Sequence, residues 1–326
     1  MSDEAWPPVP ARIAEAEVGV GEQLARGGAS TVFSIAGPRK TLLYKKYSRP
    51  RDAGELAELV GTHAGWDAKT LARVRHTLAW PVATVGEDGQ AVGALVVRAA
   101  AGFQFTLPSG RTRVRDFNFL LYEKRSEKLG VPRATDREKV DLLRALVDVL
   151  SWLDDHGFVH EDLASHNLLW KLGPAEVFVL DCDSLRPLGS ESSSPLYTTV
   201  DWTDPRVLTD EVTRPDRAST SYVLGLLVPR VLISPSWYPN DALPPERLPA
   251  ALTELVVRAS GPAASRPSLT EWARGLDKAS AQTTGTVVEP APVGDPAAVR
   301  TVDRWIFAGG LLLGALLAIF VLARFV

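Results

Sequence analysis

The sequence predicts an α+β protein, in which a small strand-rich part precedes a larger helical part and one apolar helix ends the chain. Three observations lead to this prediction. Short segments rich in strand-forming residues fill the region from Val18 to about Arg98, whereas helical periodicity dominates from Asp116 onward. Near the end of the chain, residues 305–323 contain no charge. With 326 residues, 45% of them hydrophobic, the chain can bury a substantial core.

Composition narrows the classes of partner and compartment. The formal net charge of −3 and the isoelectric point near 6.0 give no overall basic field, so we expect no nucleic-acid partner. The single cysteine, Cys182, allows no intrachain disulfide and follows an apolar run, which predicts a small buried hydrophobic residue. The start MSDEAWPP has neither a basic nor an apolar export segment, so the folded part is expected in a reducing cytoplasm.

The strand-rich region contains three strand patterns and one helix pattern. The strand patterns are VGVGEQLARGGASTVFSI (18–35), KTLLYKKY (40–47) and WPVATVGEDGQAVGALVV (80–97). In the third, GEDGQ predicts a hairpin turn. Between the second and the third, DAGELAELVGTHAG (52–65) predicts a helix with Leu56, Leu59 and Val60 on one face.

The clearest helix pattern is DREKVDLLRALVDVLSWLDDHG (136–157). Asp136 is expected to cap this helix and Gly157 to end it. The chain then runs into FVHEDLASHNLLW and the strand pattern EVFVLDCDSL. Here Asp162 and Asn167 share a loop, and Asp181 follows the apolar run VFVL.

These last three residues suit phosphoryl transfer. That reaction needs a carboxylate that orients or deprotonates the attacking hydroxyl, and oxygen ligands for the magnesium that neutralises the triphosphate. Asp162 is the candidate for the first task, and Asn167 and Asp181 are the candidates for the second. The alternative is structural, because Asp and Asn in loops commonly stabilise turns through hydrogen bonds to the backbone.

HEDLASHN resembles the catalytic loop of the protein-kinase superfamily, in which His-Arg-Asp is followed by four residues and Asn, and DCD resembles its Asp-Phe-Gly motif. In LARGGASTVF, Gly27, Gly28 and Val32 resemble the glycine-rich turn over the phosphates, although Ala25 and Ser30 replace two of its glycines. The pattern as a whole is most similar to a bacterial branch of serine/threonine-kinase-like proteins.

Lys45 in LLYKKY matches the lysine that contacts the α- and β-phosphates in this family, with Lys46 as the alternative one residue out of phase. Glu55 is the expected partner of that lysine, because Leu59 one turn later can then join the core. Glu58 is the other candidate.

The resemblance covers about residues 19–278. It implies a bilobal protein-kinase-like fold with an N-lobe at about 19–98 and a C-lobe at about 99–278. It also implies ATP and Mg²⁺ as cofactors and Ser/Thr hydroxyls of protein substrates as acceptors. The later segments that resemble the family are 203–206, 222–225 and 266–272. The residues implied in the reaction are Gly27, Gly28, Val32 and Lys45 at the nucleotide, Glu55 beside Lys45, Asp162 at the substrate hydroxyl, and Asn167 and Asp181 at magnesium.

Besides Ala25 and Ser30, the sequence departs from the family at four further places. Glu161 replaces the arginine that pairs with an activation-segment phosphate in many kinases, and Asp183 replaces a flexible glycine and adds a carboxylate near the expected metal site. Arg206 replaces the glutamate that pairs with the late arginine, here Arg266, which would leave two like charges together. Thr220 replaces an aspartate that braces the catalytic loop.

These departures leave two other functions open. One is a pseudokinase, a membrane-tethered module that binds nucleotide or partners without catalysis. The other is a small-molecule kinase of the aminoglycoside or choline type, which has a similar His-x-Asp loop and tolerates Asp-x-Asp in the next motif. The long segment from Ser184 to Arg206 favours a protein substrate over a small molecule.

The ends of the chain have separate expectations. Residues 1–18 are an N-terminal extension, and residues 279–303 are a Pro/Ala-rich linker with a reach of roughly 25–30 Å. Residues 304–326 are expected to cross a membrane once, because the uncharged stretch gives a helix of roughly 28 Å. With Arg300 and Arg304 on the near side, this predicts a C-terminal anchor in the cell membrane and a kinase-like domain in the cytoplasm.

Within the expected anchor, Gly310, Gly314 and Ala318 repeat every four residues. Small residues on one helix face permit close backbone approach, which predicts a homodimer through this face. The alternative is that the pattern has no role, since glycine and alanine are common in membrane helices.

Three further patterns concern the helical part. His160 is expected to hold its loop rather than act as an acid or base. The basic run Lys124, Arg125 and Lys128 predicts a solvated helix face, with anionic lipid as the alternative ligand. GSESSSPLYTT (189–199) is rich in hydroxyls and is either a phosphorylation site or a disordered loop.

Overall fold

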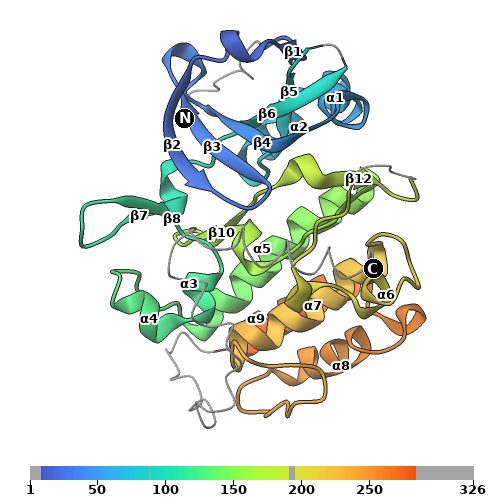
Figure 1. The fold of residues 1–326 in the computed structure, drawn as a ribbon. Helices are drawn as coiled ribbons and strands as arrows, with labels where there is room; N and C mark the ends of the chain where they lie inside the picture. Colours follow the sequence, from blue (N-terminus) through green and yellow to red (C-terminus); the bar gives the residue numbers. More distant parts are fainter. Residues whose placement is uncertain (1–8, 88, 191–194, 284–326) are drawn as a thin grey trace, which may run out of the picture. The chain divides into compact units, whose positions relative to one another are not determined.

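The computed structural model describes residues 9–87, 89–190 and 195–283 (Figure 1). These residues form an α+β protein whose N-terminal part is rich in strands and whose C-terminal part is helical, which confirms the predicted class. They group into two units. Unit 1 contains the described residues up to 66 together with 81–98, and unit 2 contains 67–80 together with those from 99 onward.

Unit 1 is built on a sheet that has six strands among the described residues, in the order β1-β5-β6-β4-β3-β2. The strands are β1 (Arg12–Ile13), β2 (Val20–Arg26), β3 (Ser30–Ile35), β4 (Leu42–Asp52), β5 (Pro81–Val85) and β6 (Gln90–Val97). Strand β1 pairs in parallel with β5, and the remaining neighbours pair antiparallel. The predicted hairpin at GEDGQ is confirmed, because it connects the antiparallel strands β5 and β6.

One helix, α1 (Ala53–Thr62), packs against this sheet. Asp52 caps it by accepting a hydrogen bond from the backbone N–H of Gly54 at 2.7 Å. Leu56, Leu59 and Val60 are buried, which confirms the predicted apolar face. The helix therefore covers the side of the sheet that Tyr47 of β4 faces.

Unit 2 is mainly helical. Its helices are α2 (Ala68–Thr77), α3 (Asn118–Leu121), α4 (Glu123–Glu127), α5 (Asp136–Asp155), α6 (Pro205–Leu208), α7 (Arg217–Leu232), α8 (Ala250–Ala259) and α9 (Leu269–Gln282). Helix α5 packs against α7 and α9, and α8 packs against both of these. Leu142, Leu143 and Leu146 of α5 and Trp272 and Leu276 of α9 are fully buried in this core.

Three antiparallel pairs of short strands complete unit 2. They are β7 (Gln104–Thr106) with β8 (Thr112–Val114), β9 (Phe158–His160) with β12 (Leu185–Pro187), and β10 (Leu168–Lys171) with β11 (Glu176–Val179). Strand β9 precedes the loop that contains Asp162, and β10 follows it. The last two pairs therefore fix both ends of that loop.

The N-terminal cap of α5 differs from the prediction. Thr135 caps the helix: its hydroxyl accepts from the N–H of Glu138 at 3.2 Å, and its own N–H donates to the Glu138 carboxylate at 2.7 Å. Thr135 has an extended backbone, whereas Asp136 is already helical, so the expectation that Asp136 caps the helix is wrong. The predicted end is confirmed, because Gly157 follows the helix with a φ of +78°.

The segment around α2 belongs to unit 2 although its neighbours in sequence belong to unit 1. The N–H of Ala79 donates to the carbonyl of Val179 in β11 at 2.8 Å. Trp80 contacts Phe158 edge to face, with ring centroids 5.4 Å apart. This segment therefore supports β11, the strand that leads to Asp181.

Among the residues that the structure describes, every helix is too short or too polar to cross a bilayer. The predicted anchor at 304–326, with Gly310, Gly314 and Ala318, lies outside the described residues, and so do residues 191–194 of the hydroxyl-rich segment. Helix α9 extends to Gln282 and buries Ala279, so it includes the first residues of the segment expected to be a linker.

Candidate functional site

The loop between β9 and β10 places Asp162 among hydrogen-bond donors. One carboxylate oxygen, Oδ1, accepts from both the N–H and the hydroxyl of Thr199, each at 2.8 Å. The side-chain amide of Asn167 donates to the Asp162 carbonyl at 2.8 Å and lies 3.3 Å from Oδ2. The Asp162 carboxylate is therefore fixed by its own loop and by the chain segment before α6.

His160 connects this loop to the chain beside Asp181. Its ring is buried, with Nε2 at 2.9 Å from the carbonyl oxygen of Leu180. Its Nδ1 accepts from the N–H of Asp162 at 3.2 Å, which leaves Nε2 as the donor. Both ring nitrogens are used in structural bonds, as expected for a histidine that holds its loop.

The β10–β11 hairpin brings Asn167 and Asp181 to the same end. Leu168 pairs with Val179, and the N–H of Leu180 donates to the Asn167 carbonyl at 2.8 Å. Asp181 adopts the left-handed region with a φ of +55°, which side-chain-bearing residues rarely enter. Ser184 stabilises this turn, since its N–H and hydroxyl both donate to the Asp181 carbonyl, at 3.0 and 2.7 Å. Such strained backbone is concentrated at functional sites.

The two residues that follow Asp181 are buried. Cys182 is fully buried and its thiol lies 3.4 Å from the Val179 carbonyl, which confirms its expected role as a small hydrophobic residue. The additional carboxyl group, Asp183, is 3% exposed. It lies in the short 3₁₀ turn Cys182–Ser184, so it points into protein and not into bulk water.

Glu161, next to Asp162, is a buried carboxylate between two arginines. It accepts from Nη1 of Arg214 at 2.6 Å, and Nε of Arg186 lies 3.8 Å away. Only 6% of Glu161 is exposed. The departure from the kinase pattern thus inverts the charge at this position, and two cations neutralise it. Sequence reasoning did not identify either arginine, because Arg214 is 53 residues from Glu161.

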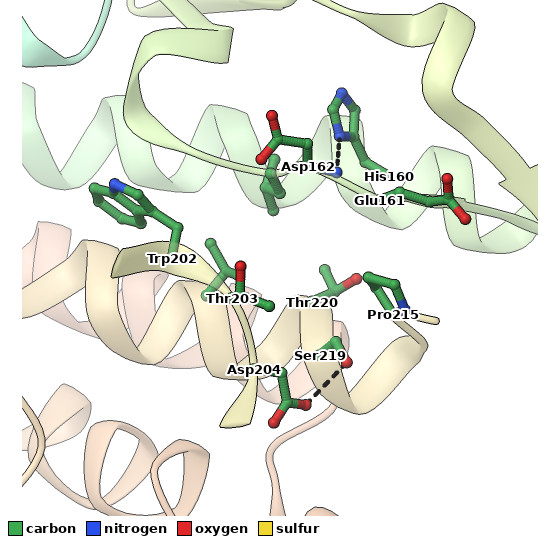
Figure 2. Close-up of a pocket in the computed structure, with 11 residues that line it drawn as sticks. His160, Glu161, Asp162, Trp202, Thr203, Asp204, Pro215, Ser219 and Thr220 are labelled. Carbon is green, nitrogen blue, oxygen red and sulfur yellow. Dashed lines mark hydrogen bonds between the residues drawn. The ribbon is translucent and has the colours of Figure 1, made fainter. Parts of the chain in front are cut away.

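A small pocket lies beside the Asp162 loop (Figure 2). It is lined by His160, Glu161, Asp162, Leu163, Trp202, Thr203, Asp204, Pro215, Ser219, Thr220 and Val223. Figure 2 shows the segment His160–Asp162 on one side and Ser219 and Thr220 of α7 on the other. The free volume of about 20 Å³ has room for about one water molecule, so it cannot hold a nucleotide. The space adjoins Thr220, where the kinase pattern has the longer aspartate.

Asp204 supplies the carboxylate that the kinase pattern has as a glutamate at the position of Arg206. Arg266 forms two bonds to it, with Nη1 at 2.6 Å from Oδ2 and Nη2 at 3.2 Å from Oδ1. Arg206 is 2.8 Å from Oδ2 of Asp204 and 2.7 Å from Asp216. The expectation that Arg206 and Arg266 leave two uncompensated like charges is therefore wrong, because Asp204, two residues before Arg206, forms ion pairs with both.

The same network sets the charge of Asp204. Burial alone would raise the pKa of this carboxyl group. The hydrogen bonds from Arg266 and Arg206 outweigh burial and lower the pKa below its usual value. The hydroxyl of Ser219 at the start of α7 also donates to Asp204, at 2.9 Å (Figure 2). Asp204 is therefore an ionised anchor that ties α6 to α7 and to the segment before α9.

In unit 1, the predicted lysine lies on the face of β4 that α1 covers. Lys45 is 7% exposed, and its neighbours in alternation, Leu43 and Tyr47, pack with the α1 core. Lys46 is exposed on the opposite face and forms an ion pair with Glu15 at 2.7 Å. This difference in burial favours Lys45 over Lys46 as a functional lysine.

The two candidate partners of the lysine also differ in burial. Glu55 on α1 is partly buried, whereas Glu58 is exposed. Glu55 therefore remains the better candidate for a partner of Lys45.

The glycine-rich segment forms the turn between β2 and β3. The N–H of Gly27 donates to the Ser30 carbonyl at 2.8 Å, and the Ser48 hydroxyl donates to Gly28 at 3.1 Å. Val32 on β3 lies opposite Lys45 on β4. Val32 and Lys45 thus lie side by side on adjacent strands, and Gly27 and Gly28 lie in the turn that leads into β3.

The described residues contain no cluster of three or more His, Cys, Asp or Glu side chains suited to a metal ion. Asn167 and Asp181 offer two oxygen donors at one end of the β10–β11 hairpin. Mg²⁺ commonly takes one or two protein carboxylates together with water and substrate phosphates. The pair therefore fits magnesium that is held mainly by a nucleotide.

No protein-family model matches the chain, and no curated protein matches it either.

Proposed function

We propose that this protein is an ATP- and magnesium-dependent kinase of the serine/threonine type, anchored in a membrane by residues 304–326. The observation that carries the proposal is the arrangement of Asp162, Asn167 and Asp181. Hydrogen bonds from Asn167 and Thr199 orient the Asp162 carboxylate, and the β10–β11 hairpin pairs Asn167 with Leu180, the residue before Asp181. The bilobal kinase-like fold is part of this proposal.

In the proposed reaction, Asp162 accepts a hydrogen bond from the attacking hydroxyl and then takes its proton. The contact with Thr199 supports this role, because Oδ1 of Asp162 already accepts a threonine hydroxyl at 2.8 Å. Asn167 and Asp181 would hold Mg²⁺, which when bound neutralises charge on the phosphates. Lys45 would contact the α- and β-phosphates, and Glu55 would hold Lys45.

The pairing of Glu161 supports a catalytic loop that is ordered without phosphorylation. In the kinase pattern, an arginine at this position pairs with a phosphate on the activation segment. Here Glu161 already contacts Arg214 and Arg186, so the loop is fixed by charges that the chain itself provides. Control of this protein would then act elsewhere than at the Glu161 position.

One observation favours a pseudokinase as the second candidate. Thr199 gives both of its donors to Oδ1 of Asp162, the atom that a substrate hydroxyl would use. A fixed contact of this kind would block the acceptor position. In the active enzyme, by contrast, the substrate either shares this oxygen with Thr199 or displaces the hydroxyl.

The decisive experiment measures phosphate transfer by the full chain in detergent with ATP and Mg²⁺. We expect ADP release and phosphate on Ser or Thr, detected by mass spectrometry, with no transfer after chelation of Mg²⁺. Asp162→Asn and Asp181→Asn should each lower the rate by about 10²-fold or more. Asp155→Asn, which changes an exposed acid at the end of α5, is the matched control and should keep the rate.

Three outcomes contradict the leading proposal. Equal transfer by all variants would show that a contaminating kinase is responsible. Nucleotide binding without transfer to protein or small hydroxyl compounds would favour the pseudokinase, and transfer to small hydroxyl compounds alone would favour a small-molecule kinase. Thr199→Val separates the two views of the Thr199 contact: it lowers the rate if the hydroxyl positions Asp162 and raises it if the hydroxyl blocks the acceptor site.

A further inference from the structure

Within unit 2, the β7–β8 hairpin contacts α3 and lies near the turn after α4. Phe105 of β7 contacts Phe119 of α3 edge to face, with ring centroids 4.9 Å apart. Gly130, in the turn after α4, lies beside β7, because a Cβ placed there would be 3.9 Å from the carbonyl oxygen of Thr106. The hairpin and α4 therefore form one continuous surface.

This surface is strongly cationic. Its basic residues, all exposed, are Arg111, Arg113, Lys124, Arg125 and Lys128. The two acids of α4 pair with basic residues outside this group. Glu123 is turned inward, with only 4% of its side chain exposed, and pairs with Lys139 at 3.0 Å. Glu127 is neutralised by Arg133 at 2.8 Å.

The rest of the surface of unit 2 is organised differently. Arginines elsewhere are commonly matched by acids, as in the ion pairs Arg137–Asp141, Arg144–Asp277 and Arg258–Glu271. The whole chain has a formal net charge of −3, so the cationic surface is local and not a reflection of composition. Clustered cations whose nearby acids are paired with other basic residues present a positive face to an anionic partner.

The uncharged stretch 305–323 indicates which anionic partner is near. In the sequence, residues 283–304 separate α9 from this stretch, and a flexible chain of that length would reach roughly 23–28 Å. Such a tether would keep unit 2 close to a bilayer at high effective concentration, where even modest electrostatic attraction favours contact.

We propose that the surface formed by the β7–β8 hairpin and α4 binds anionic phospholipid headgroups and so lays unit 2 against the membrane. The proposal rests on the membrane anchor of the proposed function. It does not require that the protein transfers phosphate. Binding by this surface should depend on lipid charge and weaken as salt is raised, whereas insertion of the anchor should depend on neither.

The test uses the full chain in vesicles of phosphatidylcholine, with or without about one third phosphatidylserine. A fluorophore is attached to Ser109→Cys, in the exposed tip of the hairpin, because the native Cys182 is fully buried. Vesicles also contain a lipid that quenches fluorescence at the headgroup. We expect quenching in anionic vesicles that is at least about threefold greater than in neutral ones and is lost near 0.5 M salt.

Charge-reversal variants assign the effect to the surface. Arg111→Glu/Arg113→Glu should abolish the difference between anionic and neutral vesicles. Lys124→Glu/Lys128→Glu tests the α4 side independently, so a folding defect in one variant does not decide the outcome. The matched control Lys69→Glu/Lys278→Glu makes the same charge change at exposed lysines of α2 and α9 and should keep the difference.

Quenching that is insensitive to lipid charge, or that survives both reversals at the surface, would overturn the proposal. Failure of the chain to float with neutral vesicles would contradict the anchor alone. In that case the surface is judged by flotation with anionic vesicles, which must be lost in the Arg111→Glu/Arg113→Glu variant for the proposal to stand.

Discussion

Asp116, at the start of α3, shows how one buried carboxyl group connects to the candidate catalytic loop. Its carboxylate accepts from the N–H of Asn118 at 2.9 Å, and its carbonyl accepts from the indole N–H of Trp170 at 3.0 Å. The Asn118 side chain in turn accepts from the Ser165 hydroxyl at 2.8 Å. Burial raises the pKa of Asp116 to about 7, and the bond from Asn118 offsets only part of this.

This raised pKa predicts a pH-dependent loss of stability. Unfolded Asp116 ionises near its usual value of 3.8, whereas the folded group keeps its proton to about 7. The folded state therefore binds more protons between these values, and the free energy of unfolding falls as the pH rises through this window. Asp116→Asn should remove this loss. Relative to the unaltered chain, the variant should gain on the order of 2 kcal/mol in the free energy of unfolding between pH 5 and pH 8, because about two pH units of the window lie above pH 5.

Thermal or denaturant unfolding of both proteins at pH 5 and pH 8 measures this difference. The exposed Asp155→Asn is the control and should show the same pH dependence as the unaltered chain. An Asp116→Asn protein whose stability follows the unaltered chain at both pH values would show that Asp116 is ionised in the fold.

At the same scale, the sequence predicted those site residues that come from one short stretch. Asp162, Asn167 and Asp181 lie within 20 residues of each other, so local patterns place them on one loop and one hairpin. Thr199 contacts Asp162 from 37 residues away in the sequence, and Arg214 contacts Glu161 from 53 residues away. No periodicity or capping signal marks such partners, because their positions depend on how α6 and α7 pack.

At the scale of elements, the sequence predicted those with a strong apolar pattern. Helix α1 and helix α5 bury one clear face each, and both were expected. Helix α2 was not expected, because Val74 is its only buried residue among the described positions and its pattern is mostly polar. Strand β8 was missed for a similar reason, since all three of its residues are exposed.

Asp204 determines how three elements are joined, and its replacement should be costly. Its side chain is fully buried between Arg266 and Arg206. Asp204→Asn would leave these guanidinium groups without their shared anion, so we expect a loss of roughly 3–5 kcal/mol in the free energy of unfolding. Asp216→Asn is the matched comparison and should cost roughly 1 kcal/mol, because the Asp216 side chain is 43% exposed.

Denaturant unfolding of the two variants separates these values. Equal, small losses would show that the buried Asp204 cluster contributes no more than an exposed ion pair. A large loss for both would show instead that Arg206 depends equally on each of its acids.

At the scale of the whole molecule, the proposed membrane anchor rests on the sequence and not on the described structure. The described residues supply two units with buried cores, and the uncharged stretch 305–323 lies beyond them. An uncharged apolar stretch of this length is typical of a helix that crosses a lipid bilayer, which is why the proposal places it there.

Membrane attachment should therefore depend on residues 304–326 alone. We expect the full chain to remain in the membrane fraction after an alkaline carbonate wash, which removes proteins held only by charge. A chain that ends at residue 283, just after α9, should be released by the same wash. Arg111→Glu/Arg113→Glu in the full chain should stay in the membrane fraction, because the cationic surface positions unit 2 and does not anchor the chain. Release of the full chain would refute the anchor, and retention of the shortened chain would show that other residues hold it.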